Sequence, residues 1–210
     1  MIGFYNYTVI LTYLSLCSAV VGITQVFEGN EPIAILCLLI SGICDLFDGK
    51  VARHKKDRTD QEKLFGIQID SLADIVCFGV LPACIGYHLG FNYGLGLISS
   101  VLIVLCGLIR LGYFNVKEEE RQRSTEENRK EYQGLPITTS SIILPLLFLG
   151  KNNIPDVAYP YVFQGFMIVL AILFVLNIKV KKMSAKGIFL MFTLAALLIL
   201  GFWKFSPFHK

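Results

Sequence analysis

Four aspartates stand in two neighbouring apolar segments of the chain, at spacings that give each pair one helical face. Asp45 and Asp48 are three residues apart, and Asp70 and Asp74 are four apart, so each pair shares a face of its helix. Ionisable side chains inside membrane-type segments are costly and by default functional. If the two helices pack antiparallel, the four carboxylates meet at one depth, and we expect a functional site there.

Four buried carboxylates cannot all stay ionised without compensation. Either they are protonated, or they bind hard divalent cations, which prefer carboxylate oxygens. We favour two Mg²⁺ or Mn²⁺ ions held by all four aspartates, because pairs of such ions also clamp phosphates during in-line displacement. The alternative is a structural network in which Lys50 and Arg53 neutralise Asp45 and Asp48. That network leaves the second pair of aspartates without partners on their own span.

Small residues accompany both pairs of aspartates. Gly49 and Ala52 follow the first aspartate at positions i+4 and i+7, so a large ligand can lie against the helix backbone there. Arg53 comes next, where a guanidinium can hold phosphate oxygens. Gly66 stands four residues before the third aspartate, on the same face. The pattern favours a ligand that carries phosphate.

The composition indicates an integral membrane protein. Of the 210 residues, 54% are hydrophobic and only 17% are charged, which predicts an all-α, polytopic transmembrane helical bundle. A span needs about 20 apolar residues, and seven candidates are found at 5–26, 32–53, 65–89, 93–116, 134–150, 157–179 and 186–205. We therefore expect six to seven spans in a single domain, residues 1–210, with the core motif at 45–74 and C-terminal spans at 157–205.

The placement of charge predicts the orientation. If the loops 54–64, 117–133 and 180–186 lie on one side, that side and the adjoining helix ends carry 16 of the 19 Lys and Arg residues. By the positive-inside rule this side is cytoplasmic. The N-terminus is then inside, and the aspartates lie near the cytoplasmic face of the cell membrane. Such loops can also attract anionic lipid headgroups, and no nucleic-acid partner is expected.

The two motifs together resemble the signature of the CDP-alcohol phosphotransferases. The matching positions, eight over 30 residues, are Asp45, Asp48, Gly49, Ala52, Arg53, Gly66, Asp70 and Asp74. The spacer of 12 residues between the fifth and sixth of these positions is longer than in the commonest family pattern. Within the family, the stretches "FGIQIDSLADIVCFGVLPA" (65–83), "GLIRLGYFN" (107–115) and "GLP" (134–136) are similar to the phosphatidylserine synthase branch.

Three features depart from that branch. The first span shows Val9 and Ser15 around Thr12 where asparagines are usual, and Tyr113 replaces the second Arg of the fourth-span motif. "GLP" is followed by Ile-Thr-Thr instead of the more usual Ser-Pro. The first departure lies where CDP would be contacted, and the other two lie where the acceptor alcohol would bind.

The resemblance implies an enzyme that transfers the phosphatidyl group of CDP-diacylglycerol to L-serine, giving phosphatidylserine and CMP. It implies that Gly49, Ala52, Arg53 and Gly66 contact the CDP and phosphate groups. It also implies that Asp74, besides holding metal, is the base that takes the proton of the serine hydroxyl. A homodimer is expected from the resemblance alone.

Arg110 and the acceptor leave alternatives open. Arg110 can pair with the carboxylate of serine or with an active-site aspartate. The same chemistry can serve glycerol phosphate or an inositol compound, but phosphorylated acceptors need further basic residues, and within the spans only Arg110 is a candidate. A cation or proton transporter is a third reading. It explains intramembrane carboxylates but not Gly49, Ala52 and Arg53 at fixed spacing.

Overall fold

The structure is a computed structural model, and it describes residues 3–4, 7–54, 59–90, 94–124, 131–181, 187 and 197. The α-helices are α1 (Ile10–Phe27), α2 (Glu31–His54), α3 (Asp60–Ile75), α4 (Leu81–Leu89), α5 (Leu95–Ser124), α6 (Ser140–Leu149) and α7 (Tyr159–Val175). The 3₁₀ turns are η1 (Tyr7–Val9), η3 (Ile137–Thr139) and η4 (Gly150–Asn153), and η2 (Val76–Val80) is a π-helical turn. Two short strands, β1 (Glu131–Gln133) and β2 (Lys179–Lys181), pair antiparallel.

The predicted all-α membrane fold is confirmed. Four helices are long and apolar enough to cross a membrane, and they run over Tyr7–Phe27, Glu31–Gly49, Asp60–Leu89 and Leu95–Glu120. These helices correspond to the first four predicted spans. The fifth is shorter than predicted as a helix, because residues 134–139 form a non-helical segment and a 3₁₀ turn before α6. The sixth is α7, and the seventh, 186–205, lies outside the described residues except for 187 and 197.

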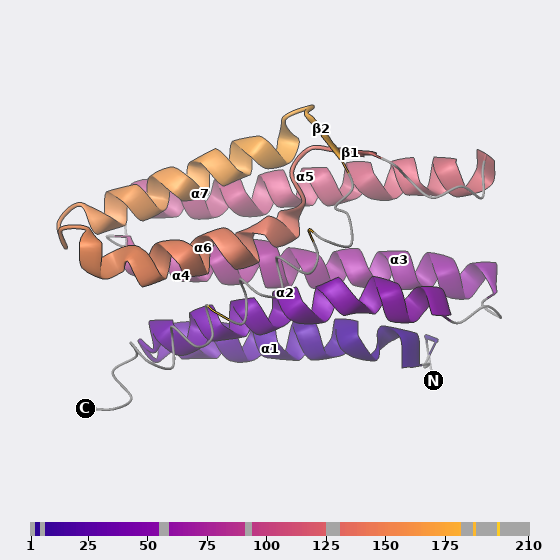
Figure 1. Ribbon diagram of the computed structural model, residues 1–210, viewed down its shortest axis with the longest axis horizontal. Coiled ribbons are helices and arrows are strands. Elements are labelled where there is room, and N and C mark those ends of the chain that lie inside the picture. The colour runs from indigo at the N-terminus through magenta and orange to yellow at the C-terminus, as the bar shows by residue number, and fades with distance from the viewer. Residues whose placement is uncertain are drawn as a thin grey trace.

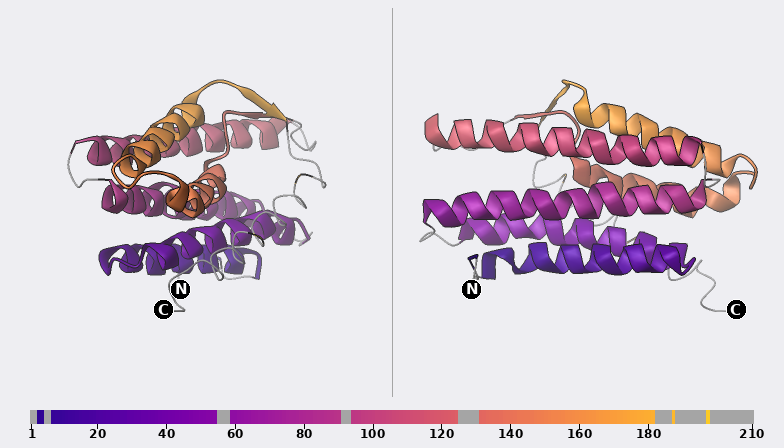
Figure 2. Two further views of the ribbon diagram at one scale, coloured as in Figure 1. Left: turned by 60° about the vertical axis from the view of Figure 1, so that its left-hand side comes forward. Right: turned by 180° about the vertical axis from the view of Figure 1, so that it is seen from behind.

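The helices form three layers (Figure 1), which Figure 2 shows again from two other sides. One outer layer holds α1 and α2, the middle layer holds α3, α4 and α6, and the other outer layer holds α5 and α7. Helix α1 packs along α2 and also contacts α3, while α5 contacts α3, α4 and α7. Figure 1 shows α2 ending, α3 beginning and α5 ending at the same end of the bundle. We call this the α2–α3 end.

Small and hydroxylated residues let α1 and α2 approach closely. A Cβ on Gly22 would lie 2.9 Å from the Cβ of Cys37, so the glycine leaves room for the neighbouring helix. The hydroxyl of Ser18 donates to the carbonyl of Cys37 at 3.0 Å. Small residues and interhelical hydroxyl bonds are the usual means of packing helices in a membrane. These contacts hold α2, the helix that carries the first aspartate pair, against α1.

A capping box begins α3, the helix that carries the second aspartate pair. The backbone N–H of Glu62 donates to Oγ1 of Thr59 at 3.2 Å, and the N–H of Thr59 donates to Oε2 of Glu62 at 2.8 Å. Two of the N–H groups that a helix start leaves without partners are thereby satisfied. The acidic residues Asp60 and Glu62 in the first turn also suit the positive end of the helix dipole.

The two strands were not predicted. Tyr132 lies opposite Val180 in the register of the pair. Their pairing brings the segment after α5 against the segment after α7. Gly134, directly after β1, has a φ of +78°, a conformation that a residue without a side chain adopts at little cost. The strands therefore link the segments that follow α5 and α7, the two helices of one outer layer.

Candidate active site

Two helices bring three of the predicted aspartates together. Carboxylate oxygens of Asp45 on α2 and of Asp70 and Asp74 on α3 all lie within 4.8 Å of one another. The three residues are half-buried. Three oxygens at such separations can contact one cation, and carboxylates are the ligands that Mg²⁺ and Mn²⁺ prefer. The donor set therefore fits a hard divalent ion.

Asp48 lies beside this group. Its carboxyl neighbours that of Asp70, and its side chain is only 7% exposed. The hydroxyl of Thr12 on α1 donates to Oδ2 of Asp48 at 3.3 Å. The four carboxyls thus lie near one another, and a hydrogen bond from α1 also holds that of Asp48.

Positive charge reaches the cluster from α5. Arg110, which is 9% exposed, is close enough to Asp74 for an electrostatic interaction. One guanidinium offsets only one of four carboxylate charges, so its presence does not remove the need for further cations. Lys50 and Arg53, which a structural network would use, have side chains outside the described ones. That alternative stays untested by the geometry.

The small residues of the motif lie on the predicted helices. Gly49 and Gly66 are half-buried positions of α2 and α3. The backbone of α2 continues as a helix through Ala52 and Arg53, which keeps Ala52 on the helical face of Asp45. The side chains of Ala52 and Arg53 are outside the described part, so their contacts with a ligand stay a prediction.

A π-helical turn, η2, begins two residues after Asp74 and was not predicted from the sequence. The N–H of Leu81 reaches back to the carbonyl of Val76 across η2. Pro82, which has no N–H, cannot donate to the carbonyl of Phe78 four residues earlier. The hydroxyl of Ser140 donates to that carbonyl at 3.2 Å instead. Pro82 is therefore the signal in the sequence that could have revealed the irregular turn. Such π-helical turns are common at functional sites.

A polar contact between α3 and α5 supports the second aspartate pair. Ser71, next to Asp70 in the chain, donates from its hydroxyl to Oδ1 of Asn115 at 2.8 Å. Nδ2 of Asn115 in turn donates to Oε1 of Gln68 at 3.4 Å. Both bonds tie the α3 face that flanks the aspartates to a fixed point on α5. We call Gln68, Ser71 and Asn115 the α3–α5 contact.

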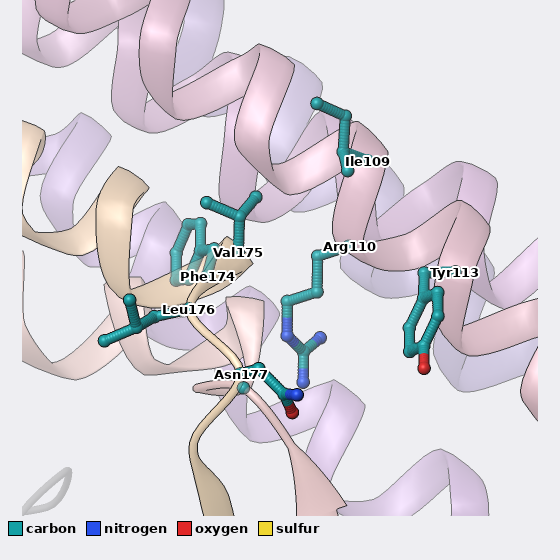
Figure 3. A pocket seen from close by; sticks show the side chains of 8 residues that line it. Ile109, Arg110, Tyr113, Phe174, Val175, Leu176 and Asn177 are labelled. Atoms are coloured by element: carbon teal, nitrogen blue, oxygen red, sulfur yellow. The ribbon is translucent and has the colours of Figure 1, made fainter.

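A cavity of about 310 Å³ lies between α5 and the end of α7. Its polar lining includes Arg110, Tyr113 and Asn177, and Gly134 and Phe174 also line it (Figure 3). Because Arg110 also interacts with Asp74, the cavity and the aspartate cluster share one guanidinium. The sequence motifs predict a role for Arg110 and none for Asn177. The role of Asn177 depends on how α7 ends.

Comparisons with known proteins agree with this geometry. A family model for CDP-alcohol phosphatidyltransferases matches residues 5–178, and this range contains all four aspartates and the cavity. The chain is 33% identical over 169 residues to a CDP-diacylglycerol–serine O-phosphatidyltransferase of Helicobacter pylori (strain J99), a match that covers 77% of this chain and 67% of the relative.

Two further relatives come from other domains of life. A Saccharomyces cerevisiae CDP-diacylglycerol–serine O-phosphatidyltransferase is 36% identical over 119 residues, which are 55% of this chain and 42% of the yeast protein. The archaetidylserine synthase of Methanothermobacter thermautotrophicus is 30% identical over 181 residues, which cover 85% of this chain and 70% of the archaeal protein.

Proposed function

We propose that this chain, which belongs to the CDP-alcohol phosphatidyltransferase family, transfers the phosphatidyl group of CDP-diacylglycerol to L-serine and releases CMP. The observation that carries the proposal is the convergence of Asp45, Asp70 and Asp74 within 4.8 Å on two helices. The names of the bacterial and yeast relatives, which specify serine as acceptor, support the choice of acceptor. Residues 1–210 are proposed to form one domain, which the single family match over 5–178 supports.

The donor is proposed to bind at the aspartates with two Mg²⁺ or Mn²⁺ ions. All four of Asp45, Asp48, Asp70 and Asp74 would hold these ions. Thr12, which donates to Asp48, would orient that carboxylate. When bound, the ions supply positive charge that offsets the charge of the pyrophosphate. Gly49, Ala52 and Gly66 are proposed to give the nucleotide access to the helix backbone, and Arg53 to contact a phosphate.

Asp74 is proposed to act as the general base. It accepts the proton of the serine hydroxyl as the hydroxyl oxygen attacks the phosphorus on the lipid side of the pyrophosphate. The bond between that phosphorus and the bridging oxygen breaks, and the electron pair leaves with CMP. Arg110, which interacts with Asp74, can keep this carboxylate oriented between the donor and the acceptor. Proton transfer by a positioned side chain contributes about 10²–10⁴ in rate.

The protein is an integral membrane protein, and we propose that the α2–α3 end faces the cytoplasm, with the N-terminus inside. The concentration of Lys and Arg in the loops 54–64, 117–133 and 180–186 supports this orientation. The pairing of β1 with β2 also supports it, because it joins the second and third of these segments. The acyl chains of the donor would stay in the bilayer while its nucleotide enters from the cytoplasm.

A homodimer is also proposed, from the family resemblance alone, with one complete site in each protomer. Native mass analysis in a mild detergent measures the oligomeric state directly. Monomers alone at micromolar concentration would contradict the proposal.

The proposed function is tested by CMP release from CDP-diacylglycerol with a panel of acceptors. The purified protein is mixed with Mg²⁺ or Mn²⁺ and with L-serine, glycerol 3-phosphate, myo-inositol or inositol phosphate in turn. We expect CMP and phosphatidylserine with L-serine and only background CMP with the others. Faster release with another acceptor would reassign the substrate. Absence of CMP with every acceptor would favour the transporter reading.

A further inference from the structure

Ser15 on α1 is joined to α2 by a pair of hydrogen bonds. Its side chain is 3% exposed. The hydroxyl of Ser15 donates to the carbonyl of Ser41 on α2 at 3.1 Å, and the hydroxyl of Ser41 donates to the carbonyl of Ser15 at 2.9 Å. The two bonds run in opposite directions between the same two residues. Together they fix how α1 lies along α2 at this level of the bundle.

The same hydroxyl also reaches η2. Oγ of Ser15 lies 3.3 Å from Sγ of Cys77, a fully buried residue of η2. A hydroxyl has one hydrogen to donate and two lone pairs with which it accepts. Because that hydrogen is donated to the carbonyl of Ser41, the thiol of Cys77 is the donor to Ser15. One hydroxyl therefore holds α2 and η2 at once, and we call Ser15, Ser41 and Cys77 the serine–thiol contact.

The serine–thiol contact lies one helical turn from the aspartate cluster. Ser41 comes four residues before Asp45, and Cys77 comes three residues after Asp74. Residues at such spacings are neighbours on a helix. The side chain of Cys77 is also close enough to Asp74 and Asp45 for an electrostatic interaction. The contact is thus next to the cluster, on the side away from the α2–α3 end.

Helix α1 packs against both helices that carry the aspartates. It contacts α2, α3 and η2, and Figure 1 shows it with α2 in one outer layer, beside the middle layer that holds α3. The carboxylates of the two helices repel one another when they are ionised. Their separation must therefore be set by other contacts, and the hydroxyl of Ser15 makes such a contact with each side.

We propose that Ser15 is a positioning residue that sets the separation of Asp45 and Asp74, and thereby the preference of the cluster among divalent ions. The inference rests on the metal site of the proposed function. Mg²⁺ requires near-ideal octahedral geometry with oxygens at about 2.0–2.1 Å, whereas Ca²⁺ accepts flexible coordination at about 2.3–2.6 Å. Carboxylates held at a fixed, short separation favour the smaller ion. Loss of the hydroxyl should therefore cost Mg²⁺ more affinity than Ca²⁺.

Competition between metal ions tests the proposal without turnover. Mn²⁺ is bound to the purified protein in a mild detergent, and the EPR signal of free Mn²⁺ reports its displacement by Mg²⁺ or by Ca²⁺. In Ser15→Ala we expect the affinity for Ca²⁺ relative to that for Mg²⁺ to rise about two- to tenfold, the factor that one hydrogen bond contributes. An unchanged ratio, or a shift toward Mg²⁺, would overturn the proposal.

Ser18→Ala is the matched control. The hydroxyl of Ser18 on α1 donates to the carbonyl of Cys37 on α2 at 3.0 Å, so this variant loses a bond of the same kind between the same two helices. Cys37 is eight residues before Asp45, about two helical turns away. We expect the ratio of the two affinities to stay that of the unmodified protein. An equal shift in Ser15→Ala and Ser18→Ala would show general loosening of the helix pair and would overturn the role of Ser15.

Changes at Cys77 test the same contact from η2, and they replace Ser15→Ala if that variant does not fold. Cys77→Ser keeps a donor to Ser15 and should keep the ratio of the unmodified protein. Cys77→Val removes the donor and should shift the ratio toward Ca²⁺. The shift in the double variant with Ser15→Ala should be smaller than the sum of the two single shifts, because both changes remove one contact. A ratio unchanged in Cys77→Val, or changed equally in Cys77→Ser, would overturn the proposal.

The failure of this inference differs from the failure of the proposed function. If Mn²⁺ does not bind the unmodified protein, or binds Asp70→Asn equally well, the metal site itself is wrong and the inference falls with it. If Mn²⁺ binds at the cluster and phosphatidylserine forms from CDP-diacylglycerol and L-serine, but Ser15→Ala keeps the same ratio, the function stands and the positioning role alone is wrong.

Discussion

Thr12 on α1 donates a hydrogen bond of 3.3 Å from its hydroxyl to Oδ2 of Asp48 on α2, and both side chains are buried. Helix α1 carries no aspartate of its own, and this bond joins it to the motif on α2. The branch that the sequence resembles usually has asparagines on this span. Thr12 supplies a polar group in their place and is expected to orient Asp48.

Thr12→Val should weaken metal binding while leaving the helix intact. The valine keeps the branched shape but removes the donor to Asp48, and a hydrogen bond to a charged group is worth about 1.5–3 kcal/mol. We expect the half-saturating concentration of Mn²⁺ to rise about tenfold, and Thr12→Ser to restore it. The control is Thr24→Val, because Thr24 is exposed and its hydroxyl donates to the carbonyl of Val21 on the same helix at 2.7 Å. Equal metal dependence in Thr12→Val and Thr24→Val would remove Thr12 from the site.

Asp45→Asn, Asp48→Asn and Asp70→Asn should each abolish turnover while the protein still inserts into the membrane. Each change removes an anionic oxygen from a set of four where charge balance is needed. CMP release at saturating Mn²⁺ measures the loss. Asp60→Asn is the matched control, since Asp60 starts α3 and pairs with Lys63 at 3.0 Å in an exposed position. Substantial turnover in all three site variants would exclude the metal site.

Thermal stability separates lost chemistry from lost folding in these variants. In EDTA the carboxylates of the cluster repel one another, so removing one charge should leave the melting temperature equal to or above that of the unmodified protein. Added Mn²⁺ should raise the melting temperature of the unmodified protein more than that of Asp70→Asn. A lower melting temperature of the variants in EDTA would point to a structural role.

Asp74→Asn should impair chemistry more than donor binding. The amide keeps the size and shape of the side chain but cannot take the serine proton, and the loss of a general base costs about 10²–10⁴ in rate. Binding of CDP-diacylglycerol at saturating Mn²⁺ is compared with single-turnover CMP formation in the presence of L-serine. Parallel loss of both would reassign Asp74 to metal binding alone. Unchanged turnover would exclude both roles.

Ser71→Ala should lower turnover through the position of α3. The alanine cannot make the hydrogen bond of 2.8 Å that the Ser71 hydroxyl donates to Oδ1 of Asn115. The face with Asp70 and Asp74 is therefore held less firmly against α5. We expect kcat to fall and the half-saturating Mn²⁺ concentration to rise, with Ser71→Thr restoring both. Ser100→Ala is the control, because Ser100 also links two helices, by a bond of 2.9 Å to the carbonyl of Ala83. Equal effects on kcat in the two alanine variants would show general destabilisation only.

Long apolar runs made the main helices predictable from the sequence. The break at residues 88–94 was also predicted, because Gly and Asn residues there favour a turn. The structure confirms it, since α4 ends at Leu89 and α5 begins at Leu95. The spacing of the aspartates also predicted that each pair shares a helical face, because that depends only on neighbouring positions in the chain. The four helices of the described residues that are long enough to cross a membrane follow this pattern.

The features that escaped prediction depend on contacts between distant residues. The π-helical turn of η2 is stabilised by Ser140, which is 62 residues from Phe78 in the chain. The pair β1–β2 is three residues long in each strand, too short for a period to emerge. The cavity requires the end of α7 to lie beside Arg110, and no local pattern encodes that placement. The assigned roles of the site residues remain predictions.

The central claim is that the aspartate cluster supports metal-dependent phosphatidyl transfer to serine, and one measurement addresses it directly. The purified protein is stripped with EDTA, supplied with CDP-diacylglycerol and isotopically labelled L-serine, and then titrated with Mn²⁺, and the lipid product is identified by mass spectrometry. We predict no labelled lipid before the metal is added, labelled phosphatidylserine in equal amount to CMP afterwards, and none at any metal concentration with Asp70→Asn. Labelled phosphatidylserine formed without divalent metal, or formed equally by Asp70→Asn, would contradict the claim.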